Sequence, residues 1–105
     1  MKLLTKEIRD NLPKLGETDG QGWDAVAQVK FFSIASNWRW FATEFDGEDT
    51  FFGYVQGFDN ELGYFSLSEL ESVEWLGIPA IERDINWKPK TLGEIKKSLE
   101  TNQYA

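Results

Sequence analysis

The sequence predicts a small α+β fold: a mainly antiparallel sheet of four to five strands with two or three short helices. Aromatic and β-branched residues alternate with other residues over 25–34 and 38–58, a pattern typical of half-buried strands. The dipeptide Asp46-Gly47 stands between two such runs and indicates a hairpin turn. Capping-box spacings beginning at Ser66 and at Thr91 each open a segment with a helical stripe of aliphatic residues.

The N-terminal residues predict a helix, a loop and a strand, in that order. Thr5 is the expected N-cap of a helix over residues 5–12, and Pro13 should end it. Residues 16–22 contain three glycines and no aliphatic side chain, so we expect a loop. The first strand lies within residues 23–34, and its expected core face is made of Ala25, Ala27, Val29, Phe31 and Ser33.

The centre of the chain, residues 36–58, predicts a hairpin on which the sheet is built. Under strict alternation, one face of the strand 38–45 carries Trp38, Trp40, Ala42 and Glu44, and the other carries Arg39, Phe41, Thr43 and Phe45. Because both faces carry aromatic rings, this strand should be central and covered on both sides. Gly53 and Gly57 in the following strand predict a bulge, or the ring of Trp38 or Trp40 lying against bare backbone.

The C-terminal half predicts a short strand, a helix, an extended segment and a last helix. A turn over 59–61 leads to a strand over 62–65. The helix expected over 67–75 turns Leu67, Leu70, Val73 and the more distal Leu76 toward the core, with Gly77 as its stop. Residues 78–87 should hold a fifth extended segment before the helix that begins after Thr91. A chain of 105 residues fits a single domain over 1–105, and we expect residues 100–105 to fray.

The composition removes most catalytic chemistries. The chain has no His and no Cys, which excludes Ser-His-Asp and Cys-His nucleophiles and the usual zinc ligand sets. It carries no phosphate-binding loop and no dinucleotide fingerprint. Carboxylate pairs of the kind that hydrolyse glycosides remain as an alternative. The cluster Asp46, Glu48 and Asp49 lacks the ligand spacing of an EF-hand loop. We therefore expect a protein that is not an enzyme and uses no cofactor or metal.

Acidic residues are concentrated in one part of the chain. The net charge is -7, and no Lys or Arg occurs between Trp40 and Glu82, where ten acidic residues stand. Such a one-sign field repels phosphates, so we expect no direct contact with nucleic acid. It suits docking on a basic protein, although ordinary solubility charge is an equally good explanation. The expected partner-binding residues are Glu44, Asp46, Glu48, Asp49, Asp59 and Glu61. We assign most aromatic residues to the core.

The sequence also bears on location. No apolar run approaches the roughly 20 residues of a membrane span. Charges recur through the first twelve residues, unlike the apolar stretch of a signal peptide. We therefore expect a cytoplasmic protein that does not contact a membrane. The sequence leaves the oligomeric state open.

Several segments resemble a known family. The runs LLTKEI, VKFF, SNWRWFATEFDGEDTFFGYVQGF, ELGYFSLSEL and IERD together resemble short uncharacterised proteins that are catalogued as a domain of unknown function. That family is carried largely on bacterial plasmids, phages and integrative elements. The resemblance covers residues 1–89, and its most specific part is WRWFATEFDGEDTFFG. No catalytic residue of the family can be mapped onto this chain.

The resemblance implies a function that the residues alone do not. Relatives of the family include type II anti-CRISPR inhibitors, so it implies a protein of a bacterial host's mobile element that binds the Cas9–guide RNA complex. Cas9 holds its heteroduplex in a positively charged channel, on which an acidic protein could dock. The alternative is an accessory or structural interaction module of plasmid or phage biology without a nuclease target.

Overall fold

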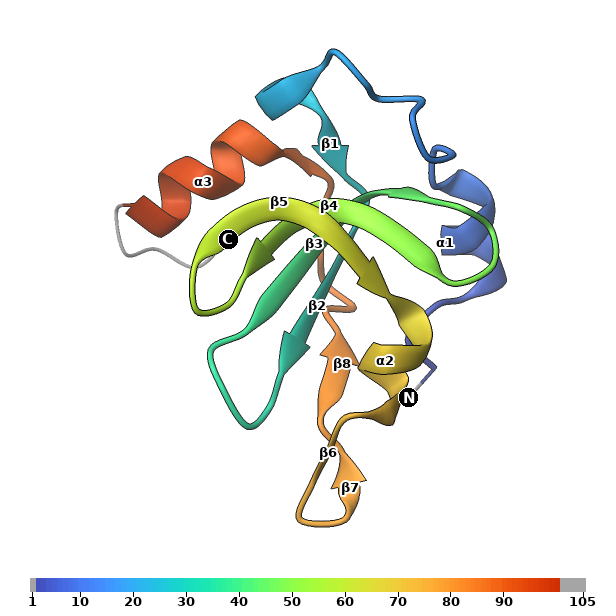
Figure 1. Cartoon of the computed structure of the whole chain (residues 1–105), viewed down its shortest axis with the longest axis vertical. Coiled ribbons are helices and arrows are strands. Elements are labelled where there is room, and N and C mark those ends of the chain that lie inside the picture. The colour runs from blue at the N-terminus through green and yellow to red at the C-terminus, as the bar shows by residue number, and fades with distance from the viewer. Residues whose placement is uncertain (1, 101–105) are drawn as a thin grey trace.

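The computed structural model describes residues 2–100 and shows a five-stranded antiparallel sheet with the strand order β5-β4-β3-β2-β8 (Figure 1). This confirms the predicted α+β class. The sheet strands are β2 (Val29–Ser33), β3 (Arg39–Phe45), β4 (Thr50–Gln56), β5 (Asn60–Ser66) and β8 (Ile81–Arg83). Glu100 ends the last helix, and the rest of the tail predicted to fray lies outside the described residues.

Helices and two short ribbons complete the fold. The helices are α1 (Lys6–Asn11), α2 (Leu67–Ser72) and α3 (Leu92–Glu100), with a 3-10 turn η1 (Gly22–Asp24). One ribbon pairs β1 (Val26–Ala27) with β9 (Lys90–Thr91), and the other pairs β6 (Glu74–Trp75) with β7 (Ile78–Pro79). Among residues 2–100, no helix has both the length and the apolar character needed to cross a bilayer.

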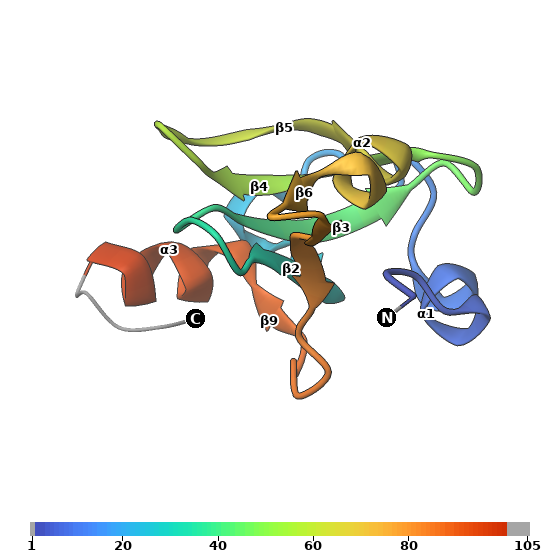
Figure 2. The ribbon, with the colours of Figure 1, turned by 90° about the horizontal axis from the view of Figure 1, so that it is seen from below.

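The sheet is covered on both faces by separate apolar clusters. On one face, Phe31, Phe45 and Phe51 pack with the N-terminal leucines and with Leu67 and Leu70 of α2. On the other face, Phe41 and Tyr54 pack with Leu92 and Ile95 of α3. Figure 2 shows α3 toward one end of the stacked strands and α1 and α2 toward the other end. The prediction that β3 is central and buried on both faces is confirmed, since six of its seven residues are buried.

A β-bulge in β3 overturns the strict alternation expected for this strand. The pairing of β3 with β4 shifts between Ala42 and Glu44, so Thr43 is an extra residue. Phe45 therefore packs in the same cluster as Trp40 and Ala42, not with Phe41. The expected grouping of Glu44 with Trp40 was wrong, because one inserted residue exchanges the faces of every side chain after it.

The two glycines of the central hairpin have the roles that the sequence indicated. A Cβ atom at Gly53 would lie 1.9 Å from the backbone oxygen of Phe41, so only glycine fits where the strands approach at the bulge. A Cβ atom at Gly57 would lie 2.5 Å from the ring of Trp38. The predicted contact between a tryptophan ring and bare backbone is thus confirmed for Trp38.

The three predicted helix starts are confirmed by their hydrogen bonds. The backbone N–H of Ile8 donates to Thr5 Oγ1 at 3.2 Å, and that of Glu69 donates to Ser66 Oγ at 3.3 Å. Thr91 and Glu94 bond reciprocally, because each side chain accepts from the other's backbone N–H. The predicted first strand is divided in two at Gln28, where β1 leaves the main sheet to pair with β9.

The predicted end of the second helix was wrong. α2 ends at Ser72, and Val73 adopts an extended backbone as its C-cap. The backbone N–H of Ala80 donates to the carbonyl of Val73 at 2.9 Å, which begins the β6–β7 ribbon. Leu76 and Gly77 form the turn of this ribbon, so Gly77 does not stop a helix. Cross-strand pairing of Trp75 with Ile78 outweighs the helical spacing of the leucines.

Candidate functional site

The six acidic residues predicted to bind a partner lie at two opposite ends of the sheet. Asp46, Glu48 and Asp49 are on the β3–β4 turn, whereas Asp59 and Glu61 are at the β4–β5 turn. β4 joins the two turns, and its seven residues span about 20 Å at the usual rise of a strand. Figure 1 shows the two turns on opposite sides of the molecule. The structure therefore does not bring the six residues together as one surface.

Glu44 is buried and cannot belong to a surface that binds a partner. Only 3% of the residue is exposed. Its carboxylate accepts hydrogen bonds from the backbone N–H of Gly16 at 2.9 Å, from that of Thr18 at 2.8 Å, and from the Thr18 hydroxyl. Burial alone would raise the pKa of Glu44, but these hydrogen bonds outweigh it and hold the pKa below its ordinary value. Glu44 thus fixes the loop over residues 16–22 to the sheet.

Asp46 is exposed, but its carboxylate shapes the β3–β4 turn. Oδ1 accepts from the backbone N–H groups of Glu48, Asp49 and Thr50 at 2.8, 2.8 and 3.0 Å. These hydrogen bonds lower the pKa of Asp46, the largest effect coming from Glu48. An aspartate that bonds its own following backbone is a common way of closing a turn.

Asp49 joins the β3–β4 turn to the start of α2. Its Oδ2 accepts from the hydroxyls of Ser66 and Ser68 at 2.5 and 3.0 Å, and its Oδ1 accepts from the backbone N–H of Ser68 at 2.7 Å. The backbone oxygen of Asp49 accepts from the N–H of Leu67 at 2.8 Å. The Ser66 hydroxyl has the largest part in lowering the pKa of Asp49. Replacing Asp46 and Asp49 would therefore disturb the fold as well as the surface charge.

The junction of the β3–β4 turn with α2 gathers five acids, four of them exposed and Asp49 half-buried, and we call this group the acidic end. It comprises Asp46, Glu48, Asp49, Glu69 and Glu71. Within residues 2–100, none of these five carboxylates takes part in an ion pair. Arg9 borders the patch, where its Nη1 donates to the carbonyl of Gly47 at 3.2 Å. Nothing in the sequence around Glu69 and Glu71 links these two acids to the β3–β4 turn.

The β4–β5 turn at the opposite end of the sheet differs from the acidic end in its side chains. Asp59 and Glu61 are exposed beside Phe58, which is 94% exposed and packs edge-on against the Trp38 ring at 5.2 Å between centroids. The turn itself carries these two carboxylates. It serves as a natural comparison for the acidic end.

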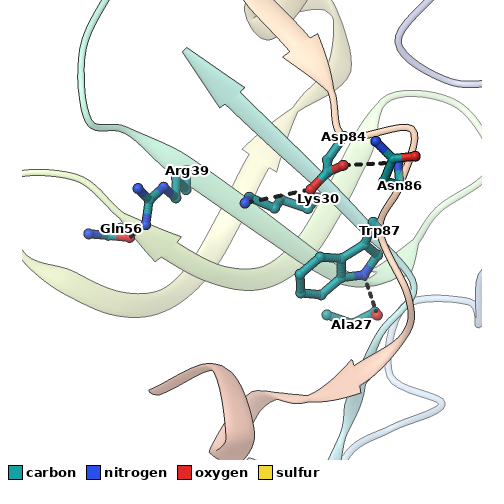
Figure 3. Close-up of polar contacts among 7 residues, drawn as sticks. All are labelled: Ala27, Lys30, Arg39, Gln56, Asp84, Asn86 and Trp87. Carbon is teal, nitrogen blue, oxygen red and sulfur yellow. Dashed lines mark hydrogen bonds and ion pairs between the residues drawn. The ribbon is translucent and has the colours of Figure 1, made fainter. Parts of the chain in front are cut away.

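A cluster around Lys30 is a further polar site that sequence reasoning missed. Lys30 Nζ lies 3.7 Å from Asp84 Oδ2 and 5.8 Å from the centroid of the Trp87 ring. Burial lowers the pKa of Lys30, and Asp84 offsets this only in part. Trp87 Nε1 donates to the carbonyl of Ala27 at 3.0 Å, and Figure 3 shows this contact beside the Lys30–Asp84 pair. These contacts fasten residues 84–87 to the sheet.

An open groove of about 400 Å³ adjoins this cluster. Its lining includes Lys30, Trp38, Arg39 and Asp84. Arg39 Nη1 donates to Gln56 Oε1 at 3.4 Å (Figure 3). The lining combines two cations, two aromatic rings and one carboxylate. It provides no pair of carboxylates flanking a cleft, the arrangement that glycoside hydrolysis requires.

An antiparallel sheet covered on both faces by short helices, with exposed carboxylates gathered where a turn meets a helix, defines a small α+β protein with an acidic surface. The chain belongs to the family described as "Protein of unknown function (DUF2958)", whose match covers residues 3–99. This agrees with the resemblance to a domain of unknown function. No curated protein and no solved structure matches the chain.

Proposed function

We propose that this protein is a non-enzymatic binding protein that docks through its acidic end on a basic, nucleic-acid-binding surface of another protein. Three exposed acids of this end, Glu48, Glu69 and Glu71, carry the proposal. None of the three side chains accepts a hydrogen bond or pairs with a cation within residues 2–100. Charges that do not hold the fold together are available to a partner.

A basic protein is the partner that such a surface favours. Complementary charge raises the rate of encounter and disfavours partners of like sign. A nucleic-acid-binding protein presents a positive surface of this kind, and the same acids would repel nucleic acid itself. The proposal therefore includes no direct contact with nucleic acid and no membrane surface.

We propose the Cas9–guide RNA complex as the first partner to test, which would make the protein a cytoplasmic anti-CRISPR inhibitor of a bacterial mobile element. This choice follows from the resemblance of WRWFATEFDGEDTFFG, and the acidic end is compatible with it. Cas9 reads its PAM with arginines and lines its channel with basic residues, so an acidic protein could occlude either surface.

A pair of charge-matched variants tests the proposal. Glu48→Lys with Glu71→Lys changes the acidic end, and Asp59→Lys with Glu61→Lys makes the same charge change at the opposite end. We expect the first pair to weaken binding to guide-loaded Cas9, and inhibition of DNA cleavage, at least tenfold. Like charges then face the basic surface. The second pair should bind guide-loaded Cas9 and inhibit cleavage within about threefold of the unmodified protein. Only the weaker long-range effect of its changed charge then acts on the partner.

Thermal melting of both double variants is the control. Both should melt like the unmodified protein, because the fold does not depend on any of the four side chains. Equal loss of binding in both pairs would show that only net charge matters and would remove the acidic end from the proposal. If the unmodified protein neither binds Cas9 nor inhibits cleavage, Cas9 is not the partner. Co-purification with a conjugation or replication protein would then favour an accessory module of plasmid biology.

A further inference from the structure

The β6–β7 ribbon forms a small arm that projects beyond the sheet at the end of α2. Figure 1 shows the arm extending from the body of the molecule below β8. Residues 71–79 are all exposed, and the chain returns to the core only at Ala80. The arm is thus held to the protein at its base, while its tip is open to contact.

Apolar side chains are gathered on this arm. Trp75 pairs with Ile78 across the two strands, so their side chains share one face. Val73 lies on the same face two residues before Trp75, and Leu76 is at the tip. Leu76 is 81% exposed, Ile78 is 50% exposed and Trp75 is 47% exposed. Exposed apolar side chains that are contiguous, and not scattered singly, are typical of an interaction site.

The tip holds a leucine in a conformation that leucine disfavours. Leu76 has φ +53° and Gly77 has φ +80°, which is the pattern of a type I′ hairpin turn. Asn or Gly suits the first central position of this turn far better than Leu. Leu76 is the one non-glycine residue with positive φ among residues 2–100. A strained residue that is also exposed does not stabilise the fold through burial, so its side chain needs another explanation.

The charges around the arm indicate the chemistry of its partner. Glu74 lies within the arm, paired with Pro79 on the face opposite Trp75. Glu69 and Glu71 of α2 lie just before the arm in the chain, and no Lys or Arg occurs from residue 40 to residue 82. An apolar tip with an acidic border fits an apolar pocket bordered by Lys and Arg. Two copies of this chain meeting through their arms would instead oppose like charges.

We propose that the β6–β7 arm is an anchor that inserts Trp75, Leu76 and Ile78 into an apolar pocket, bordered by basic residues, on the partner protein. This inference rests on the proposed function, because it names a second element of the same partner-binding surface. The acidic end steers the encounter, and the arm supplies the apolar contact that holds the complex. Aromatic and aliphatic anchors in pockets carry most of the binding energy at protein interfaces.

The variant Leu76→Asn separates a binding role from a structural one. Asn-Gly is the preferred sequence for a type I′ turn, so this variant should melt at the same temperature as the unmodified protein or higher. Its binding to guide-loaded Cas9 should nevertheless be at least tenfold weaker. Phe58→Asn is the matched control, since it removes an exposed apolar side chain from the opposite end and should leave binding within about twofold.

Each outcome decides the proposal. Leu76→Asn binding as tightly as the unmodified protein would overturn the anchor, and so would an equal loss in Phe58→Asn. If the unmodified protein does not bind Cas9 at all, the proposed partner fails, and the arm is tested with a photo-crosslinking side chain at position 76 or 58 in bacterial cells. Crosslinking to one basic protein from position 76 alone, with Leu76→Asn binding that purified protein tenfold more weakly, would support the anchor. No difference between the two positions would overturn it.

Discussion

Glu44 shows how a residue that looks like a surface charge can be part of the interior. Its carboxylate accepts three hydrogen bonds from Gly16 and Thr18, which together fix a glycine-rich loop on the sheet. Because the charged form receives these bonds, its pKa in the folded protein lies below the ordinary value of 4.5. A lowered pKa means that the stabilisation is complete above pH 4.5 and is lost as the pH falls through the folded-state pKa.

This gives a prediction for Glu44→Gln. The amide cannot accept all three hydrogen bonds and places an N–H₂ group against donors, so we expect a loss of about 1–3 kcal/mol in the free energy of unfolding near pH 7. Below pH 4.5 the difference between the two proteins should shrink, because Glu44 takes up a proton more readily in the unfolded state than in the folded state, where its pKa is lowered. Urea unfolding at pH 7 and at pH 3.5 would measure both. A difference that does not change with pH would contradict the assignment.

Single residues could be predicted from the sequence where their partners are near in the chain. Thr5, Ser66 and Thr91 were predicted as helix caps, because each bonds a group three residues away. Glu44 was assigned to the surface because its partners are 26 and 28 residues earlier. Nothing in the local pattern around Glu44 indicates that the loop over residues 16–22 returns to it.

The central hairpin shows the same limit of sequence-based prediction for whole strands and helices. Gly53 and Gly57 indicated a bulge or a close contact, and both occur, but the position of the extra residue was not apparent. The apolar residues after α2 suggested a longer helix, since Leu70, Val73 and Leu76 have helical spacing. The same residues also suit a ribbon, and the pairing of Trp75 with Ile78 decides the outcome.

The bulge makes a testable prediction about β4 and β5. Gly53 and Gly63 are direct partners across these strands, but their surroundings differ. A methyl group at Gly53 would collide with the backbone of Phe41, whereas nothing lies within 4 Å of one at Gly63. We expect Gly53→Ala to lower the free energy of unfolding by about 3 kcal/mol or more, and Gly63→Ala to leave it unchanged or slightly raised. Chemical unfolding of the two variants would measure the contrast. Similar losses in both would contradict the close contact at the bulge.

The whole molecule has its charges segregated, and this much is apparent from the sequence. The positions of the acidic residues in space are not apparent from the sequence. The residues from Asp46 to Asp49 and the pair Asp59 and Glu61 are close in the chain, but β4 separates them by its full length. Glu69 and Glu71, which are more distant in sequence, instead join the β3–β4 turn because Asp49 bonds the start of α2.

Segregated charge predicts a dependence on salt at the scale of the molecule. If the acidic end steers association with a basic partner, the association rate should fall about tenfold between roughly 0.05 and 0.5 M NaCl. The dissociation rate should change much less, because apolar contacts of the arm are not screened by ions. Surface plasmon resonance over this range would separate the two rates. A salt effect confined to dissociation would contradict steering by the acidic end.

The attachment of the N-terminal loop to the C-terminal end of β3 has a consequence for the order of folding. Two groups of β3 bind this segment. The carboxylate of Glu44 accepts from the backbone N–H of Gly16, and the backbone N–H of Phe45 donates to the carbonyl of Pro13 at 2.9 Å. We expect neither group to be in position until β3 has paired with β4 through the bulge. The first twenty residues should therefore close over a sheet that is already formed, and in native-state hydrogen exchange they should be among the first segments to open.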